Sequence, residues 1–274
     1  PGSANVIGGT GLSFKLKNAA TVQEIAIEGS EMMKMALGEN PKRCYGSEKK
    51  MPMTRMGTGA VLRETLFQAK VYSDKLKKAE TDPSVQVEPD FRLECWMPVL
   101  ERKIPLKAHV HRVDDIYTAI RIAKEFGLSM TLDHCSEGHL IAEDLAKEGF
   151  PAIVGPDLSS RSKIEVQNMA FKTAGVLHEA GVLVAITTDH PVSLIQSLPI
   201  CAGLAVKSGL PLEEGLRAIT CNPARICRVF DRVGSLEPGK DADIAIFTGN
   251  PMETFTRTMC TIINGKIVYR DTGF

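Results

Sequence analysis

Short apolar segments alternate with amphipathic helical segments over residues 104–220. The apolar segments cover 104–110, 128–133, 151–155 and 182–187, and each is followed by apolar side chains at helical spacing. Strands that are apolar along their whole length are typical of parallel sheets buried on both faces. Two folds satisfy this pattern, an open doubly wound sheet and a closed (β/α)8 barrel. The alternation therefore restricts the chain to the α/β class.

The residues before this region supply fewer such units. We predict a helix from residue 21 that leads into a strand at 32–36, and a long helix over 58–79 with an apolar stripe. Counted generously, the chain then has about six strands for the main sheet, whereas a closed barrel of this type needs about eight. The count falls short of a closed barrel, and both folds stay open at this point.

The C-terminal region has a different character. Asn264-Gly265 separates two strand-like segments, 259–263 and 266–269, and this dipeptide is the strongest short-range signal for a β-hairpin. A turn-rich stretch before Phe247 leads into a further strand. We therefore divide the chain into an α/β body at 1–229, which the motifs described below identify as a partial barrel, and a small antiparallel β element at 230–274.

Charge and composition limit the partners. The 33 basic side chains balance 33 acidic ones, so no net field recruits nucleic acid or an anionic membrane. No apolar run reaches the ~18 residues of a membrane span, and no signal peptide is visible. The 7 cysteines are scattered without a Cys-x-x-Cys pair, which is typical of reduced thiols. We expect a cytoplasmic protein that acts on a small molecule.

Two histidines and an aspartate follow the apolar segments at matching positions. His109 lies at the end of the first segment, His134 directly follows the second, and Asp189 follows the fourth. Because the carboxyl ends of barrel strands open on one face, we expect these side chains to converge. Two imidazoles and a carboxylate suit Zn²⁺ or a similar ion. The alternative is that each is a hydrogen-bonded structural residue, with Asp189 acting as a cap.

Other side chains near these positions are candidates for substrate contact. His111 is two residues beyond His109 and so points to the same side of a strand. His139 either lines the same mouth or begins a helix, and His190 directly follows the candidate aspartate. Arg161 either binds an anion at a helix start or marks a solvated helix start. Cys135 is a weak candidate nucleophile, because neighbouring residues of a strand point to opposite faces.

Several motifs together resemble the metal-dependent amidohydrolase superfamily. They are Ala-His109-Val-His111-Arg-Val-Asp-Asp115-Ile, Leu-Asp-His134, Thr-Asp189-His-Pro191, Asn222-Pro-Ala and Gly234-Ser-Leu-Glu-Pro-Gly-Lys-Asp-Ala-Asp243. The similarity covers essentially the whole chain and is specific from residue 104 onward. The branch that it resembles is the imidazolonepropionase-related and prolidase-like one.

This resemblance implies a (β/α)8 barrel of amidohydrolase type with a small β-sandwich, and metal-dependent hydrolysis of the C–N bond of an amide, cyclic amide or dipeptide-like substrate. It implies that His109, His134 and Asp189 bind one or two divalent ions, for which Zn²⁺ is expected, and that Asp189 also moves protons. Lys34 resembles the family's lysine that bridges two metals as a carbamate. Lys15 and Lys17 are the alternatives for that role.

The chain departs from the family pattern at its start. Its one His-x-His motif, His109-Val-His111, has the context of the family's fifth strand and not of its first. The resemblance therefore implies that the first strands, the first metal pair and half of the sandwich are missing. We expect a fragment with weak or absent turnover, which self-associates because an incomplete barrel exposes strand edges.

Two other classes of function stay open at this point. The first is an α/β barrel without a metal that binds a phosphorylated or acidic metabolite through Arg112, Arg161 and backbone amides. The second is a non-catalytic remnant that acts as a binding or assembly module. Imidazolonepropionase activity is a narrower enzymatic option within the family.

Overall fold

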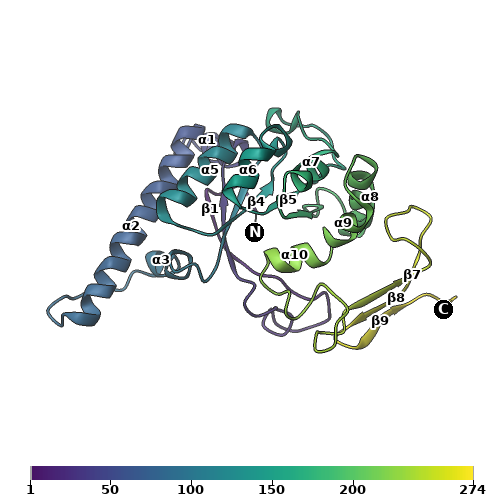
Figure 1. Ribbon diagram of the computed structural model, residues 1–274. Coiled ribbons are helices and arrows are strands. Elements are labelled where there is room, and N and C mark those ends of the chain that lie inside the picture. The colour runs from purple at the N-terminus through teal and green to yellow at the C-terminus, as the bar shows by residue number, and fades with distance from the viewer. Residues whose placement is uncertain (1, 274) are drawn as a thin grey trace. The chain divides into compact units, whose positions relative to one another are not determined.

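A computed structural model describes residues 2–273 (Figure 1). Its internal contacts group the chain into two compact units. The first contains the residues up to Gly11 together with Met32–Thr131, and the second contains Leu12–Glu31 together with the residues from Leu132 on. The division falls inside one strand, β4 (Met130–His134), so that this strand belongs to both units.

Six short strands form the main sheet, in the order β1-β2-β3-β4-β5-β6. Their bounds are β1 (Ile7–Gly11), β2 (Met32–Ala36), β3 (Leu106–Val110), β4 (Met130–His134), β5 (Ala152–Val154) and β6 (Val184–Ile186). β1 is antiparallel to β2, β2 is parallel to β3, and β4, β5 and β6 are parallel to one another. A doubly wound sheet reverses its strand order at a switch point, whereas barrel strands follow chain order. The sequential order therefore supports the barrel-type fold and excludes the doubly wound alternative.

The helices of the first unit follow its strands. They are α1 (Glu39–Ser47), α2 (Arg55–Thr81), α3 (Phe91–Glu94), α4 (Met97–Leu100) and α5 (Val113–Phe126). α2 begins after Thr54, whose side chain accepts a hydrogen bond from the Gly57 amide at 3.0 Å and so caps the helix. Its buried stripe includes Leu62 and Leu66, and it packs against α5. The predicted helix over 58–79 is confirmed. Within residues 2–273 no helix combines the length and apolarity of a membrane span.

Short helices follow β4, β5 and β6 in the second unit. They are η1 (Gly138–Leu140), α6 (Ala142–Glu148), η2 (Ile164–Val166), α7 (Thr173–Glu179), η3 (Ile195–Ser197), α8 (Leu198–Lys207), α9 (Leu212–Arg217) and α10 (Cys221–Ile226). α6 ends at Gly149, which adopts the left-handed conformation with φ 73° that glycine tolerates best. Leu132, Leu145 and Leu177 are almost fully buried and show where the strands and helices of this unit share a core.

A second sheet lies near the C-terminus and is antiparallel (yellow in Figure 1). It consists of β7 (Ile244–Phe247), β8 (Thr258–Ile263) and β9 (Lys266–Arg270). Asn264 and Gly265 connect β8 to β9 with φ of 50° and 74°, the positive values of a type I′ turn. The predicted hairpin is confirmed. The proposed domain boundary between residues 229 and 230 stays a prediction.

The segment Leu12–Glu31 differs from the prediction. No helix forms over 21–31, and the segment holds an isolated antiparallel bridge between Phe14 and Ala26. Its Lys15 is buried, and the Lys15 ammonium lies 2.7 Å from Asp241 and 2.9 Å from Asp243. The predicted helix is wrong because the backbone of this stretch pairs with residues 13–15 instead: the Ile27 amide donates to the Ser13 carbonyl at 2.9 Å, and the Ile25 carbonyl accepts from the Lys15 amide at 2.9 Å.

Candidate metal centre

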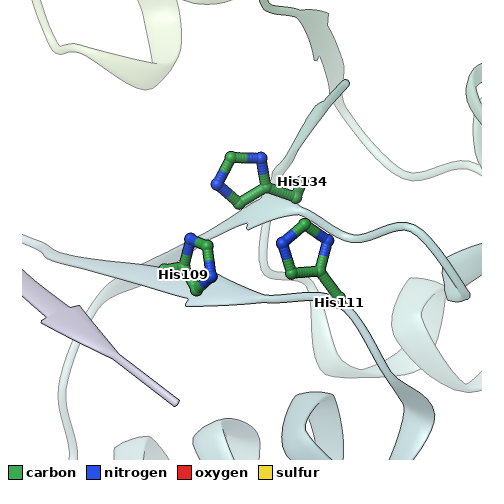
Figure 2. Close-up of side chains that lie close together, drawn as sticks. All are labelled: His109, His111 and His134. Carbon is green, nitrogen blue, oxygen red and sulfur yellow. The ribbon is translucent and has the colours of Figure 1, made fainter. Parts of the chain in front are cut away.

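Three buried histidines lie close together at the ends of two strands (Figure 2). His109 is on β3, His111 follows the end of β3, and His134 is the last residue of β4. Their side chains are only 3%, 6% and 5% exposed. One ligand nitrogen from each ring lies within 4.8 Å of the other two. The structure therefore brings His109 and His134 together and adds His111 to them.

The rings of His109 and His111 meet edge to face. Their centroids are 4.7 Å apart and their planes are 84° apart. The two residues are separated by one position, so they point to the same face of the sheet as their spacing predicts. This arrangement packs the rings while it keeps their nitrogens near one another.

The ring of His134, at the end of β4, is oriented by Gly155, which lies just after the neighbouring strand β5. His134 has φ 70°, a left-handed value that is strained for a side chain of this size. Its Nδ1 lies 2.7 Å from the carbonyl oxygen of Gly155, just after β5. Because a carbonyl only accepts, Nδ1 carries the proton and Nε2 is the acceptor nitrogen of the ring. This is the tautomer that a metal ligand needs.

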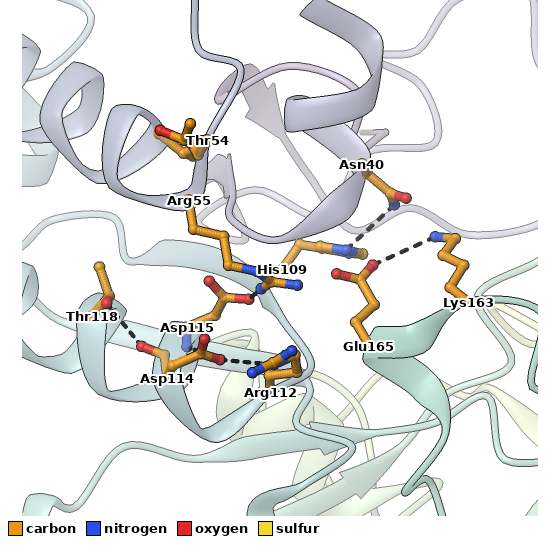
Figure 3. A network of polar contacts seen from close by, with 11 residues as sticks. Asn40, Thr54, Arg55, His109, Arg112, Asp114, Asp115, Thr118, Lys163 and Glu165 are labelled. Atoms are coloured by element: carbon orange, nitrogen blue, oxygen red, sulfur yellow. Dashed lines mark hydrogen bonds and ion pairs between the residues drawn. The ribbon is translucent and has the colours of Figure 1, made fainter. Parts of the chain in front are cut away.

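His109 is oriented by an asparagine from α1. Figure 3 shows Asn40 pointing at the His109 ring, with its Nδ2 at 3.3 Å from Nε2. Since an amide NH₂ only donates, Nε2 of His109 accepts this hydrogen bond through its single lone pair. The same amide donates to the Ser3 hydroxyl at 2.7 Å. His109 and His134 are therefore both held as neutral imidazoles.

This donor set fits a divalent cation. Zn²⁺ binds neutral imidazole nitrogens at roughly 2.0–2.1 Å, and three protein ligands with one open position are typical of catalytic zinc sites. The three nitrogens lie within 4.8 Å of one another, a spacing at which the group could hold one ion. A histidine that binds a metal through one ring nitrogen usually donates a hydrogen bond from the other. The Gly155 carbonyl accepts this bond from Nδ1 of His134.

Lys34 lies on β2, buried at 4% exposure. In the parallel register Lys34 pairs with Lys107 and Ala36 pairs with His109, so Lys34 shares a sheet face with His109 and His111. This placement is compatible with the predicted bridging role, which stays a prediction. Of the two alternatives, Lys15 is engaged with Asp241 and Asp243, and Lys17 is exposed.

Asp189 does not belong to the three-histidine group formed by residues 2–273. It lies on an exposed turn just after β6, with φ 49°, and its amide donates to the Thr187 hydroxyl at 3.1 Å. The neighbouring His190 is also exposed, and its Nδ1 accepts from the Ile195 amide at 3.3 Å. The metal, proton-transfer and substrate roles of these two residues stay predictions.

The remaining candidates for substrate contact have local partners. Arg112 precedes α5 and donates to Asp114 at 3.0 Å, separately from the ion pair between Arg55 and Asp115 (Figure 3). Arg161 donates to the Met169 carbonyl at 3.1 Å.

His139 is the third of these candidates. Its Nδ1 lies 3.0 Å from the Thr173 hydroxyl, and burial lowers its pKa. His139 also lines a cavity of about 560 Å³ between α6 and α7. The substrate contacts of Arg112, Arg161 and His139 stay predictions.

Some buried polar groups were not identified from the sequence. Glu165 on η2 is fully buried, with Lys163 at 3.6 Å (Figure 3). Asp157 follows β5, and burial raises its pKa to about 7. Burial also raises the pKa of the Cys135 thiol to about 12, which argues against Cys135 as a nucleophile. Side-chain burial of this kind has no signature in a single sequence.

Comparison with known proteins identifies the family. The model of the Amidohydrolase family matches residues 63–268, which is more than half of the chain. An amidohydrolase structure from Thermotoga maritima MSB8 is 40% identical, with a TM-score of 0.95 over 99% of this chain and 70% of that one.

Curated relatives are more distant. Amidohydrolase tasK of Hapsidospora irregularis is 27% identical over 99% of this chain and 30% of its own length. An imidazolonepropionase from Rhizorhabdus wittichii is 31% identical over 53% of this chain and 36% of its own. The chain thus spans about a third of the length of these curated relatives. The resemblance seen in the motifs of the sequence is confirmed.

Proposed function

Because this chain belongs to the amidohydrolase family, we propose that it hydrolyses a C–N bond of a small amide, cyclic amide or dipeptide-like substrate with the help of a divalent metal ion. The observation that carries this proposal is the group of three buried histidines at the strand ends. The contacts with Gly155 and Asn40 support it, because they hold the rings of His134 and His109 as neutral imidazoles.

His109 and His134 are the proposed metal ligands. We add His111 as a third, since its ring nitrogen lies in the same group, although the spacing alone had suggested substrate contact. A divalent ion at these residues supplies a Lewis acid that polarises a carbonyl and lowers the pKa of a water to near ~7. Zn²⁺ is the proposed ion, and a second ion requires the bridging role of Lys34.

Asp189 is the proposed proton acceptor. A carboxylate after a barrel strand suits general base catalysis and can return the proton to the leaving amine. The exposed position of Asp189 leaves it accessible to substrate and water. We also propose substrate contacts for His139, His190, Arg112 and Arg161. We further propose that the protein is cytoplasmic and forms a homo-oligomer.

Metal analysis of the purified chain tests the assignment directly. We expect the wild-type chain to retain zinc after dialysis, as measured by inductively coupled plasma mass spectrometry, and His109→Ala and His134→Ala to lose it. His178→Ala is the matched control, because His178 lies on α7 and outside the histidine group. Circular dichroism establishes that each variant is folded.

Unchanged metal content in both His109→Ala and His134→Ala would overturn the proposal. Asp189→Asn separates the roles of the carboxylate. Loss of amide hydrolysis with retained zinc indicates proton transfer, whereas loss of zinc indicates a ligand.

A further inference from the structure

A cavity of about 450 Å³ lies beside α1 in the first unit. Six residues line it: Ser3, Ala4, Asn40, Arg43, Cys44 and Ser47. The four on α1 are spaced i, i+3, i+4 and i+7, so they form one face of the helix. The cavity is therefore shaped by a rigid element on one side and by the chain near Ser3 on the other.

Two hydrogen bonds fix the opposite wall. Asn40 donates to the Ser3 hydroxyl at 2.7 Å, and the Tyr45 hydroxyl donates to the Asn5 side chain at 3.2 Å. Asn40 also reaches Nε2 of His109 at 3.3 Å (Figure 3). One asparagine thus belongs both to the lining of the cavity and to the surroundings of a proposed metal ligand.

The cavity has a positive character. Arg43 is its one charged lining residue, and no acidic side chain lines it. Within residues 2–273 the Arg43 guanidinium has no ion pair or side-chain hydrogen bond, and the residue is exposed. A guanidinium with five free donors matches a planar carboxylate. Arg43 lies about one helical turn, roughly 5 Å, beyond Asn40.

We propose that this cavity is a subsite for a substrate carboxylate, bound by Arg43 a few bonds away from the C–N bond that is hydrolysed near His109. The inference rests on the proposed function and narrows it to anionic substrates. Arg43 provides the charge and a bidentate pair of hydrogen bonds. The Asn40 amide and the Ser47 hydroxyl are the neutral polar groups at the two ends of the helical stripe.

Binding of two matched probes tests the subsite without requiring turnover. The 274-residue chain, loaded with zinc, is titrated with N-acetyl-L-alanine and with N-acetyl-L-alaninamide in a calorimeter, and acetate serves as a free anion. We expect the acid to bind roughly tenfold more tightly than the amide, as a charge-assisted pair allows. Arg43→Ala should abolish this preference, and Arg43→Lys should retain part of it.

Lys42→Ala removes the same charge from the neighbouring position, which does not line the cavity, and should keep the preference. Ser47→Glu places an anion in the cavity and should abolish the preference for the acid even if Arg43→Ala fails to fold.

Three results would overturn the subsite: equal affinity for the two probes, no binding of either at millimolar concentration, or a preference that survives Arg43→Ala and Ser47→Glu. Acetate binding equal to that of the acid also overturns it, because the site then holds only a free anion. Metal content is measured in parallel, so loss of zinc in His134→Ala supports the metal site independently of these outcomes.

Discussion

Two polar clusters of this molecule are built in opposite ways. Around Lys15, opposite charges meet directly: the ammonium contacts Asp241, Asp243 and the side chain of Asn264. Around His134, the partner is a neutral backbone carbonyl, which fixes the ring proton on Nδ1. The first cluster pairs full charges, whereas the second groups neutral imidazole rings at a spacing that could hold one cation.

This difference separates a structural polar cluster from a functional one. A buried ion pair with complete partners fixes a segment of chain, and its loss affects stability. A group of neutral imidazole rings contributes little to stability by itself and can prepare a binding site. Variants of the two clusters should therefore have different readouts, stability for Lys15 and metal content for the histidines.

The largest effect is expected at Gly155, where a substitution should change both stability and metal content. Gly155 has φ 120°, and a side chain there would collide with the Thr187 carbonyl oxygen. Gly155→Ala should lower the free energy of unfolding by more than about 3 kcal/mol and displace the carbonyl that orients His134. Gly149→Ala is the control, because no atom lies within 4 Å of the added group, and it should cost about 1 kcal/mol. Equal losses in chemical denaturation would contradict this account.

Removal of the Lys15 charge should have the next largest effect. Lys15→Met removes the ammonium that contacts both Asp241 and Asp243, of which, within residues 2–273, only Asp241 keeps another cation, Arg232 at 2.9 Å. The variant should cost about 2 kcal/mol, with zinc content unchanged. Lys17→Met, at an exposed position, should change stability by less than about 0.5 kcal/mol.

The Lys15 effect should depend on pH. The hydrogen bond from Lys15 is the main cause that holds the pKa of Asp241 below its usual value. A depressed carboxyl pKa contributes stability that is present above the unfolded pKa and is lost as pH falls through the folded one. The difference between wild type and Lys15→Met should therefore shrink in acid, and a difference that grows in acid would contradict the assignment.

Asn40→Ala should have a smaller effect that appears in the metal readout. The variant removes the side-chain amide that hydrogen-bonds to the His109 ring. Loss of such a contact to a ligand residue typically changes metal affinity by about tenfold. The dissociation constant for zinc is measured by competition with a chromophoric chelator. Asn168→Ala, which loses an exposed hydrogen bond to Glu137, is the control and should leave zinc affinity unchanged. Unchanged affinity in both variants would remove Asn40 from the site.

The smallest effect is expected at Asp157. Because burial raises its pKa to about 7, the folded state keeps a proton that the unfolded state releases near pH 4. Stability should therefore fall as pH rises from about 4 to 7, and Asp157→Asn should remove this slope and gain about 1 kcal/mol at pH 8. Denaturation curves across this range check it, with the exposed Asp144→Asn as control. A slope that persists in Asp157→Asn would show that another group causes it.

Much of the fold followed from local patterns. The strands near 104–110 and 182–187 and the helix over 58–79 have a periodicity that packing preserves. The hairpin at Asn264-Gly265 followed from turn chemistry that needs no tertiary partner. The helix expected from residue 21 does not form because the backbone around Ala26 pairs with residues 13–15, a contact that helical periodicity does not reveal.

The candidate site was predictable only in part. His109 and His134 could be placed together because parallel strands end at one edge of a sheet. The Gly155 carbonyl has no side-chain signature, and Asn40 reaches His109 only through tertiary structure. Asp189, expected beside them, lies outside their group because the turn after β6 leaves it exposed.

The buried sulfur next to His134 provides a natural reporter of this strand. Cys135 is completely enclosed and its thiol ionises only at about pH 12, so iodoacetamide should not react with it while β4 is intact. Exposed Cys95 should react at once and serve as an internal standard in the same sample. The rate at which Cys135 becomes alkylated therefore measures how often the end of β4 opens, and bound zinc should slow that rate.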